Sequence, residues 1–267
     1  MFDSLILSLL TIIGVVLFVV IDNTYNGKVN GPSKHVVFLG LDGLGTRNLK
    51  RAKIPNINFI KNNGAWTSQV SIDPFSNGSG PNWVGMLSGY DSASSNITDN
   101  SCKKPKYPTV IDQLMQANQS VAVSTQWHAV KCFINNVTYY QDEERAQTHI
   151  PRLIDTVHRG YSFVFIHVDN LDFIGHRVSG GSDTYIKEVE KLDNDYVGPL
   201  LDYVKHTDDY TLIIASDHGH KLTSKDHSND AVSFFMYGKG IQKGKLRPMK
   251  NVDIYDYLKQ LLFWKED

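Results

Sequence analysis

The sequence predicts an α/β fold in which a mainly parallel central sheet is flanked by helices on both faces. Five apolar runs are continuous rather than alternating, which is typical of strands buried on both faces. These runs span residues 35–43, 119–127, 161–169, 210–217 and 231–238. Helical patterns lie between them, as in a parallel sheet built with helical crossovers. The 267 residues, 41% apolar and 21% charged, suit one sizeable globular domain.

The intervals between the predicted strands carry apolar residues at helical spacing. "PNINFIKNN" at residues 55–63 predicts a short helix that ends at Gly64. "YPTVIDQLMQAN" repeats apolar residues at the spacing of a helix, and residues 183–204 do so over a longer stretch. Pro199 should kink or divide that long helix. "VDIYDYLKQLLFW" predicts an amphipathic helix that closes the chain.

The first residues differ from the rest. Residues 5–21 form an uncharged apolar run, at the short end of the ~17–25 residues that cross a bilayer. A signal peptide is the alternative, but Asp3 is acidic and no small-residue cleavage site follows. We therefore expect an N-terminal transmembrane helix over residues 1–22 (or a signal sequence), a polar linker over 23–34, and a catalytic domain over 35–267.

The compartment is predicted from two conflicting signals. Lys28 and Lys34 follow the apolar run and no basic residue precedes it, which would place the domain in the cytoplasm. Four N-x-S/T sequons, which begin at Asn77, Asn96, Asn118 and Asn136, point to the opposite side. A disulfide between the two cysteines would do so too. We favour a membrane-anchored protein, glycosylated, with a lumenal or extracellular domain.

Charge and composition limit the partners and the metal ligands that the chain can use. A formal net charge of -1 gives no sign of a polyanionic partner such as duplex nucleic acid. The chain has ten histidines but only two cysteines, which do not form a CxxC pair. Any metal would therefore be held by imidazole and carboxylate.

Candidate ligands gather where the predicted strands end. In open α/β sheets, reactive groups lie beyond the carboxyl ends of the strands. One ligand or pair follows each of three strands, and a last histidine precedes the final strand: Asp42; Asp172 and His176; Asp217 and His218; His227. Singly, an Asp at a strand end is more often a helix cap. Together at one edge they suit two divalent ions such as zinc.

A pair of cations suggests phosphoryl chemistry, which needs a nucleophile at a helix N-terminus. In "SNGSGPNWVGMLSG", Ser79 precedes Gly80 and Pro81, and proline suits the start of a helix. Coordinated Ser79 would be an activated alkoxide, and Asn82 could donate its amide to a phosphoryl oxygen. The structural alternative for Ser79 is a plain helix cap. A glycan on Asn77 would block this pocket, so we expect Asn77 to be unmodified.

The motifs "LGLDG", "SGPNWVGMLSG", "DFIGH", "SDHG" and the later "DH" together resemble the alkaline phosphatase superfamily. The resemblance is strongest to its type I phosphodiesterase/nucleotide pyrophosphatase branch and to the catalytic domains of GPI ethanolamine-phosphate transferases. It implies one zinc-like ion on Asp172, His176 and His227, and a second on Asp42, Asp217, His218 and Ser79. It also implies a covalent phospho-enzyme on Ser79 and phosphoryl binding by Asn82.

The sequence departs from that family at three points. Ser79 stands where nucleotide pyrophosphatases usually have Thr, Trp83 stands where they often have His, and the domain is shorter than most. No motif shows the arginine that holds a monoester in alkaline phosphatases. We therefore expect a phosphodiester or pyrophosphate hydrolase that acts on a nucleotide or lipid head group, with two Zn²⁺ or alternatively Mn²⁺. The alternatives are transfer of the phospho group to an alcohol, and a catalytically inactive binding module.

Overall fold

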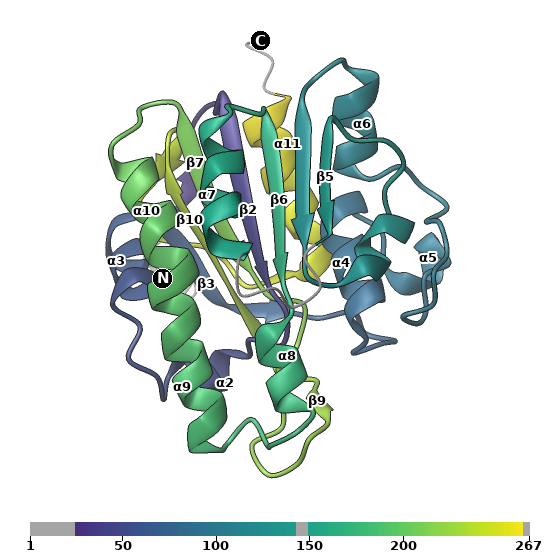
Figure 1. Ribbon diagram of the computed structural model, residues 1–267, viewed down its shortest axis with the longest axis vertical. Coiled ribbons are helices and arrows are strands. Elements are labelled where there is room, and N and C mark those ends of the chain that lie inside the picture. The colour runs from purple at the N-terminus through teal and green to yellow at the C-terminus, as the bar shows by residue number, and fades with distance from the viewer. Residues whose placement is uncertain (1–24, 143–148, 264–267) are drawn as a thin grey trace, which may run out of the picture.

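The computed structural model describes residues 25–142 and 149–263, which form one central sheet and the helices around it (Figure 1). The strands lie in the order β12 (Gly244–Lys245), β3 (Ala65–Ser71), β10 (Val232–Gly238), β7 (Tyr210–Ala215), β2 (His35–Leu41), β6 (Phe163–Val168), β4 (Val121–Thr125) and β5 (Tyr139–Asp142). β13 (Met249–Lys250) also pairs with β3. β10 is antiparallel to β7 and β3, whereas the other pairs are parallel. The predicted mainly parallel sheet is confirmed.

The five predicted strands are β2, β4, β6, β7 and β10. The strand β3 was not predicted, because "AWTSQVS" mixes small polar residues with few apolar ones. In the structure its burial alternates only in part. Two short pairs lie outside the main sheet: β1 (Lys28–Val29) with β11 (Ile241–Gln242), and β8 (Gly219–His220) with β9 (His227–Ser228). Pairs of two residues carry too little pattern to be predicted.

Helices cover both faces of the sheet because β2 is apolar on both. Val37 and Leu39 pack with one set of helices, whereas Val36 and Phe38 pack with another. The first set is α2 (Thr46–Leu49), α3 (Pro55–Asn63), α7 (His149–His158), α8 (Asn170–Gly175), α9 (Asp183–Leu192) and α10 (Gly198–Lys205). The second is α4 (Ser79–Ser88), α6 (Val110–Gln116) and α11 (Ile254–Leu262). The short helix α5 spans Ser92–Ser95, and the 3-10 turns span His128–Cys132 and Asn251–Asp253.

The long helical pattern over residues 183–204 is divided, as Pro199 predicted. A π-helical turn at Asp193–Val197 separates α9 from α10, and Pro199 lies in the first turn of α10. A proline there gives up an N–H that has no obligatory partner at a helix start.

The π-helical turn places Asp193 at the start of α3, which has no cap of its own. The buried Asp193 carboxylate accepts hydrogen bonds from the N–H groups of Asn56 (3.0 Å) and Ile57 (2.8 Å). We expect Asp193→Ala to lower the free energy of unfolding by about 2–4 kcal/mol, because two buried donors lose their acceptor. Urea denaturation tests this. Asp202→Ala, on the exposed side of α10, is the control and should change stability by less than about 0.5 kcal/mol. An equal loss in both variants would contradict the capping role.

The structure describes only part of the N-terminal segments expected from the sequence. The predicted membrane segment, residues 1–22, lies outside the described residues. Within residues 25–142 and 149–263, none of the helices is long and apolar enough to cross a bilayer. The predicted linker, 23–34, partly belongs to the fold, because Val29 is buried in the core and Lys28–Val29 pairs with β11. Cys102 and Cys132 form a disulfide.

Candidate metal centre

The candidate site lies at the carboxyl edge of the parallel strands, near α8 and β9 at the lower end of the sheet in Figure 1. Asp42 directly follows β2, and Asp217 and His218 follow β7. Gly43 turns the chain after Asp42 with φ 86°, a left-handed conformation that glycine adopts without strain. Its N–H donates to Asp217 Oδ1 at 3.1 Å, which ties the two strand ends together.

Four predicted residues form one part of the site. His218 Nε2 lies 3.3 Å from Asp42 Oδ1 and 3.3 Å from Asp217 Oδ2. Ser79, the first residue of α4, has its Oγ 3.2 Å from His218 Nε2 and 3.5 Å from Asp42 Oδ1. All four side chains are buried. This is the set that the resemblance assigned to one ion.

The other three predicted residues form the second part. Asp172, in α8, has its two carboxylate oxygens near different imidazoles: Oδ2 is 3.3 Å from His176 Nε2, and Oδ1 is 3.2 Å from His227 Nε2. The two histidine Nε2 atoms are 3.0 Å apart. The ligand atoms of Asp42 and Asp172 lie within 4.8 Å of each other, so the two parts are adjacent. The structure thus brings all seven predicted side chains together, while their roles as ligands stay predictions.

The three carboxyl groups of the cluster differ in the direction of their pKa shifts. Burial and the Asp172 carboxylate disfavour ionisation of Asp42, but hydrogen bonds from His167 and His218 hold its pKa well below the usual range. Burial also opposes ionisation of Asp172, yet bonds from His176, His220 and His227 hold that pKa low. In contrast, burial and the nearby Asp42 carboxylate raise the pKa of Asp217 well above normal. The raised pKa means that Asp217 favours its protonated form unless a cation offsets the charge of its carboxylate.

The donor set suits divalent cations. Asp217 Oδ2 is buried and has no hydrogen-bond partner among the described residues, although it lies 3.3 Å from His218 Nε2. An unpartnered buried carboxylate oxygen is costly unless an ion or proton sits on it. Asp42, Asp217 and His218 offer ligand atoms within 4.8 Å of one another, as do Asp172, His218, His220 and His227. Carboxylate and imidazole are the ligands that zinc-like ions take.

We expect the stability of the metal-free protein to depend on pH because of the buried Asp217 carboxyl. Its pKa is raised in the folded state, so ionisation above the unfolded value of about 4 costs folding free energy that grows with pH. We expect metal-free Asp217→Asn to melt above the metal-free parent at pH 7, because the amide needs no proton. The difference should vanish below about pH 3, where both states of the parent hold the proton. Melting curves with chelator at the two pH values test this, and a difference independent of pH would contradict it.

Asn82 is placed differently from the prediction. Its Oδ1 accepts from Asp73 N at 2.8 Å, and its Nδ2 donates to the carbonyl oxygens of Ser76 (3.1 Å) and Gly78 (2.9 Å). The fully buried Asn82 side chain thus braces the loop that leads into Ser79. With its amide occupied in this way, Asn82 is not positioned to bind a phosphoryl group. The sequence showed only its helical spacing from Ser79, which does not reveal which way the amide points.

Four further side chains lie at the site beyond the predicted ligands and nucleophile. His167 Nε2 (3.0 Å) and Trp83 Nε1 (3.1 Å) both bond Asp42 Oδ2, and His220 Nε2 lies 2.7 Å from Asp172 Oδ1. Asn100 Oδ1 accepts from Gly80 N at 2.8 Å, beside the candidate nucleophile. The sequence position of His220, two residues after His218, was its only signal, and Trp83 was noted only as a departure from the family pattern.

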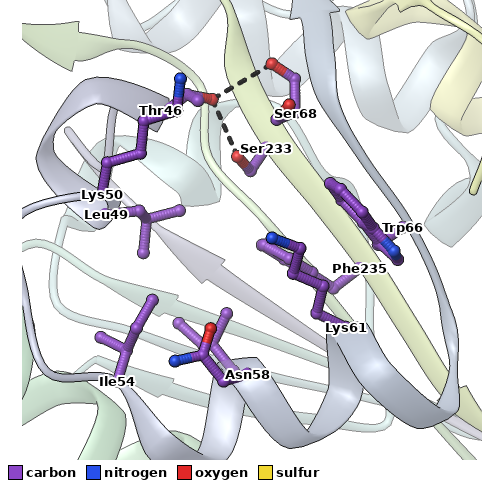
Figure 2. A pocket seen from close by; sticks show the side chains of 11 residues that line it. Thr46, Leu49, Lys50, Ile54, Asn58, Lys61, Trp66, Ser68, Ser233 and Phe235 are labelled. Atoms are coloured by element: carbon purple, nitrogen blue, oxygen red, sulfur yellow. Dashed lines mark hydrogen bonds between the residues drawn. The ribbon is translucent and has the colours of Figure 1, made fainter.

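A separate cavity of about 290 Å³ lies between α2, α3 and the strands β3 and β10 (Figure 2). Leu49, Ile54 and Phe235 line its apolar side, and Thr46 hydrogen-bonds Ser233 at 2.8 Å. None of the residues that line it is a carboxylate or an imidazole, so it offers no metal ligands.

The fold is of the alkaline phosphatase type. The chain belongs to the Metalloenzyme superfamily, whose family model matches residues 34–254. Among solved structures, murine ectonucleotide pyrophosphatase/phosphodiesterase 5 superposes with a TM-score of 0.73 at 15% identity and covers 87% of this chain and 96% of its own. Alkaline phosphatase from the Antarctic bacterium TAB5 gives 0.65 at 13% identity, with 88% and 100% covered. At such identities these likenesses show the fold.

A curated relative matches over a shorter segment. The 2,3-bisphosphoglycerate-independent phosphoglycerate mutase of Methanosarcina mazei is 33% identical over 75 residues, which is 28% of this chain and 18% of the mutase. The match therefore spans less than a fifth of the mutase. The names of these three proteins describe a phosphodiesterase, a phosphatase and a mutase, all of which act on phosphate esters.

Proposed function

We propose that this protein is a metal-dependent hydrolase of phosphodiesters or pyrophosphates that uses Ser79 as its nucleophile. The single observation that carries the proposal is the position of Ser79 Oγ, 3.2 Å from His218 Nε2 and 3.5 Å from Asp42 Oδ1. A hydroxyl in contact with two candidate ligands can share their cation. The family and the phosphoester chemistry in its relatives' names support the reaction class.

The chain's own residues would hold two divalent ions, with zinc the first candidate and manganese the alternative. Asp42, Asp217 and His218 would hold one beside Ser79, and Asp172, His176 and His227 would hold the other. When bound, such ions supply charge that stabilises an alkoxide and the phosphoryl oxygens. In this reading Ser79 Oγ gives up its proton to solvent and attacks phosphorus, and the leaving alcohol takes a proton from water.

The N-terminus of α4 supports anion binding at the same point. Ser79 is the first residue of this ten-residue helix, where free N–H groups and the helix dipole favour negative charge. Asn100 replaces Asn82 as our candidate donor to a phosphoryl oxygen. Its Oδ1 is fixed by Gly80 N–H at 2.8 Å, and none of the described hydrogen bonds uses its Nδ2.

The phospho-enzyme on Ser79 would be resolved by water, which makes the protein a hydrolase. Transfer to another alcohol uses the same site and is the alternative. A nucleotide or a lipid head group is our candidate substrate; AMP has been seen in complex with an inactive form of the murine phosphodiesterase. The exposed ring of Phe75, with 70% of its surface accessible, lies on the loop before Ser79 and offers an apolar contact for the substrate.

We also propose that the protein is membrane-anchored through residues 1–22, with its domain in the lumen or outside the cell. The Cys102–Cys132 disulfide supports this location, because disulfides persist in oxidising compartments. Protease protection of the domain in sealed vesicles tests the topology. Digestion from the cytoplasmic side would contradict it.

A panel of nitrophenyl esters tests the reaction class. We expect the metal-loaded full chain to hydrolyse nitrophenyl phosphodiesters at least about ten times faster, in kcat/KM, than nitrophenyl phosphate, since none of the site motifs carries an arginine for a monoester's extra charge. Absorbance of released nitrophenol measures both. A faster monoester would shift the assignment to a phosphatase, and no turnover of either, with metal bound, would favour the inactive binding module. Adding acceptor alcohols to the assay reveals transfer.

A further inference from the structure

The histidines around the candidate metal centre differ in what their second ring nitrogen contacts. His227 Nδ1 lies 2.8 Å from Asn77 O, and His218 Nδ1 lies 3.3 Å from Gly219 O. A backbone carbonyl only accepts, so Nδ1 carries the proton in both rings. In the neutral form of each ring Nε2 is then bare and can bind a cation, which is the arrangement expected of metal ligands.

His167 and His220 show the opposite arrangement. The Nδ1 atoms of both are buried and have no hydrogen-bond partner among the described residues. If Nδ1 carried the proton, each ring would bury an orphaned N–H donor, which folded proteins rarely tolerate. The proton therefore belongs on Nε2. His167 Nε2 lies 3.0 Å from Asp42 Oδ2, and His220 Nε2 lies 2.7 Å from Asp172 Oδ1, so each N–H donates to a carboxylate.

We infer that His167 and His220 are positioning residues rather than metal ligands, one for the carboxylate of each candidate ion. This inference rests on the proposed two-metal function. It separates His220 from His218 and His227, although all three offer nitrogens within 4.8 Å of one another and of Asp172. By distance alone His220 could be a metal ligand. The proton on its Nε2 makes it a hydrogen-bond donor to Asp172 instead.

The contacts of Asp42 show what such positioning achieves. Oδ2 receives two donors, His167 Nε2 and Trp83 Nε1 at 3.1 Å. Oδ1 instead faces Ser79 Oγ and His218 Nε2. The two donors occupy the lone pairs of one oxygen and fix the carboxylate plane, which turns the other oxygen toward the nucleophile and the ligand. A hydrogen-bonded carboxylate of fixed orientation loses less entropy when it binds an ion.

His220 is held rigidly for the same task. A Cβ at Gly175 would overlap its imidazole ring, and a Cβ at Gly180 would come within 2.9 Å of the His220 Cβ. Tyr185 packs edge-on against the ring with centroids 5.7 Å apart. The His220 side chain is fully buried. The ring therefore cannot turn Nε2 away from Asp172 without displacing backbone.

A glutamine substitution distinguishes a hydrogen-bond donor from a metal ligand. The amide N–H of glutamine can replace the histidine Nε2–H, but the amide binds zinc poorly. We expect His220→Leu to weaken metal binding about 10–100-fold and His220→Gln to stay within about threefold of the parent. Both should still bind two ions per chain at saturation. His167→Leu and His167→Gln should behave alike, and the exposed His206→Gln is the matched control. Affinity is measured by competition with a chromogenic chelator, and stoichiometry by elemental analysis.

Three results would overturn the inference. If His220→Gln binds metal as weakly as His220→Leu, or saturates with one ion fewer, then His220 is a ligand. If correctly folded His220→Leu binds as tightly as the parent, then the residue only fills space. Should the leucine variant fail to fold, the stoichiometry of the glutamine variant still decides. None of these measurements needs a substrate, so they stand apart from the ester assays that test the proposed hydrolase.

Discussion

Replacing Ser79 with Ala is expected to lower kcat/KM for the best nitrophenyl diester by about 10³-fold or more, with metal content unchanged. The Oγ atom is the candidate nucleophile, and no other hydroxyl among the described residues contacts the side chains of both Asp42 and His218. Losing a nucleophile removes the covalent route while binding and cation charge remain. Steady-state rates and elemental analysis of the same preparation provide both readouts.

The matched control is Ser94→Ala, which removes a hydroxyl from an exposed residue of α5. Its rate should stay within about twofold of the parent, as for an ordinary surface change. A Ser79→Ala variant that keeps the parental rate would remove Ser79 from the mechanism. A variant that loses its metal as well would show that Ser79 Oγ acts mainly as a ligand.

His218→Ala is expected to reduce the metal content from two ions per chain to about one and to abolish turnover. His218 Nε2 is the atom around which Asp42 Oδ1, Asp217 Oδ2 and Ser79 Oγ gather, at 3.2–3.3 Å from each. Its removal leaves Asp42 and Asp217 close together with no imidazole, so the ion they share would be held more weakly. Asp217→Asn should lose the same ion while sparing the one on Asp172.

The control for this prediction is His206→Ala, whose side chain is 74% exposed at the end of α10. It should keep two ions and the full rate. If His218→Ala also keeps two ions, measured after dialysis against buffer without metal, then the assignment of His218 as a ligand is wrong.

The sequence predicted those parts of the site that follow directly from strand position. Asp42, Asp217 and His218 end buried strands, and the carboxyl ends of parallel strands share an edge, so their meeting followed from the fold class. His227 was weaker by itself, because β9 is too short to show a pattern. It was a candidate because it precedes the last strand, and the resemblance to a family assigned it to the ion of Asp172 and His176. The structure puts its Nε2 3.0 Å from His176 Nε2.

The direction in which a side chain points could not be predicted from the sequence. Asn82 lies at helical spacing from Ser79, but its amide turns back to the Ser76 and Gly78 carbonyls. His167 sits in the middle of a buried strand pattern, where a histidine is normally a core residue, and only the register of β6 beside β2 shows that it reaches Asp42. Likewise, β3 is a strand because it pairs with β10, which no local pattern in "AWTSQVS" reveals.

Anomalous scattering from crystals grown with Zn²⁺ tests the central claim most directly. We expect two peaks per chain: one bounded by Asp42, Asp217 and His218 beside Ser79 Oγ, the other by Asp172, His176 and His227. A map without peaks at these side chains, in crystals that hold zinc elsewhere, would contradict the account.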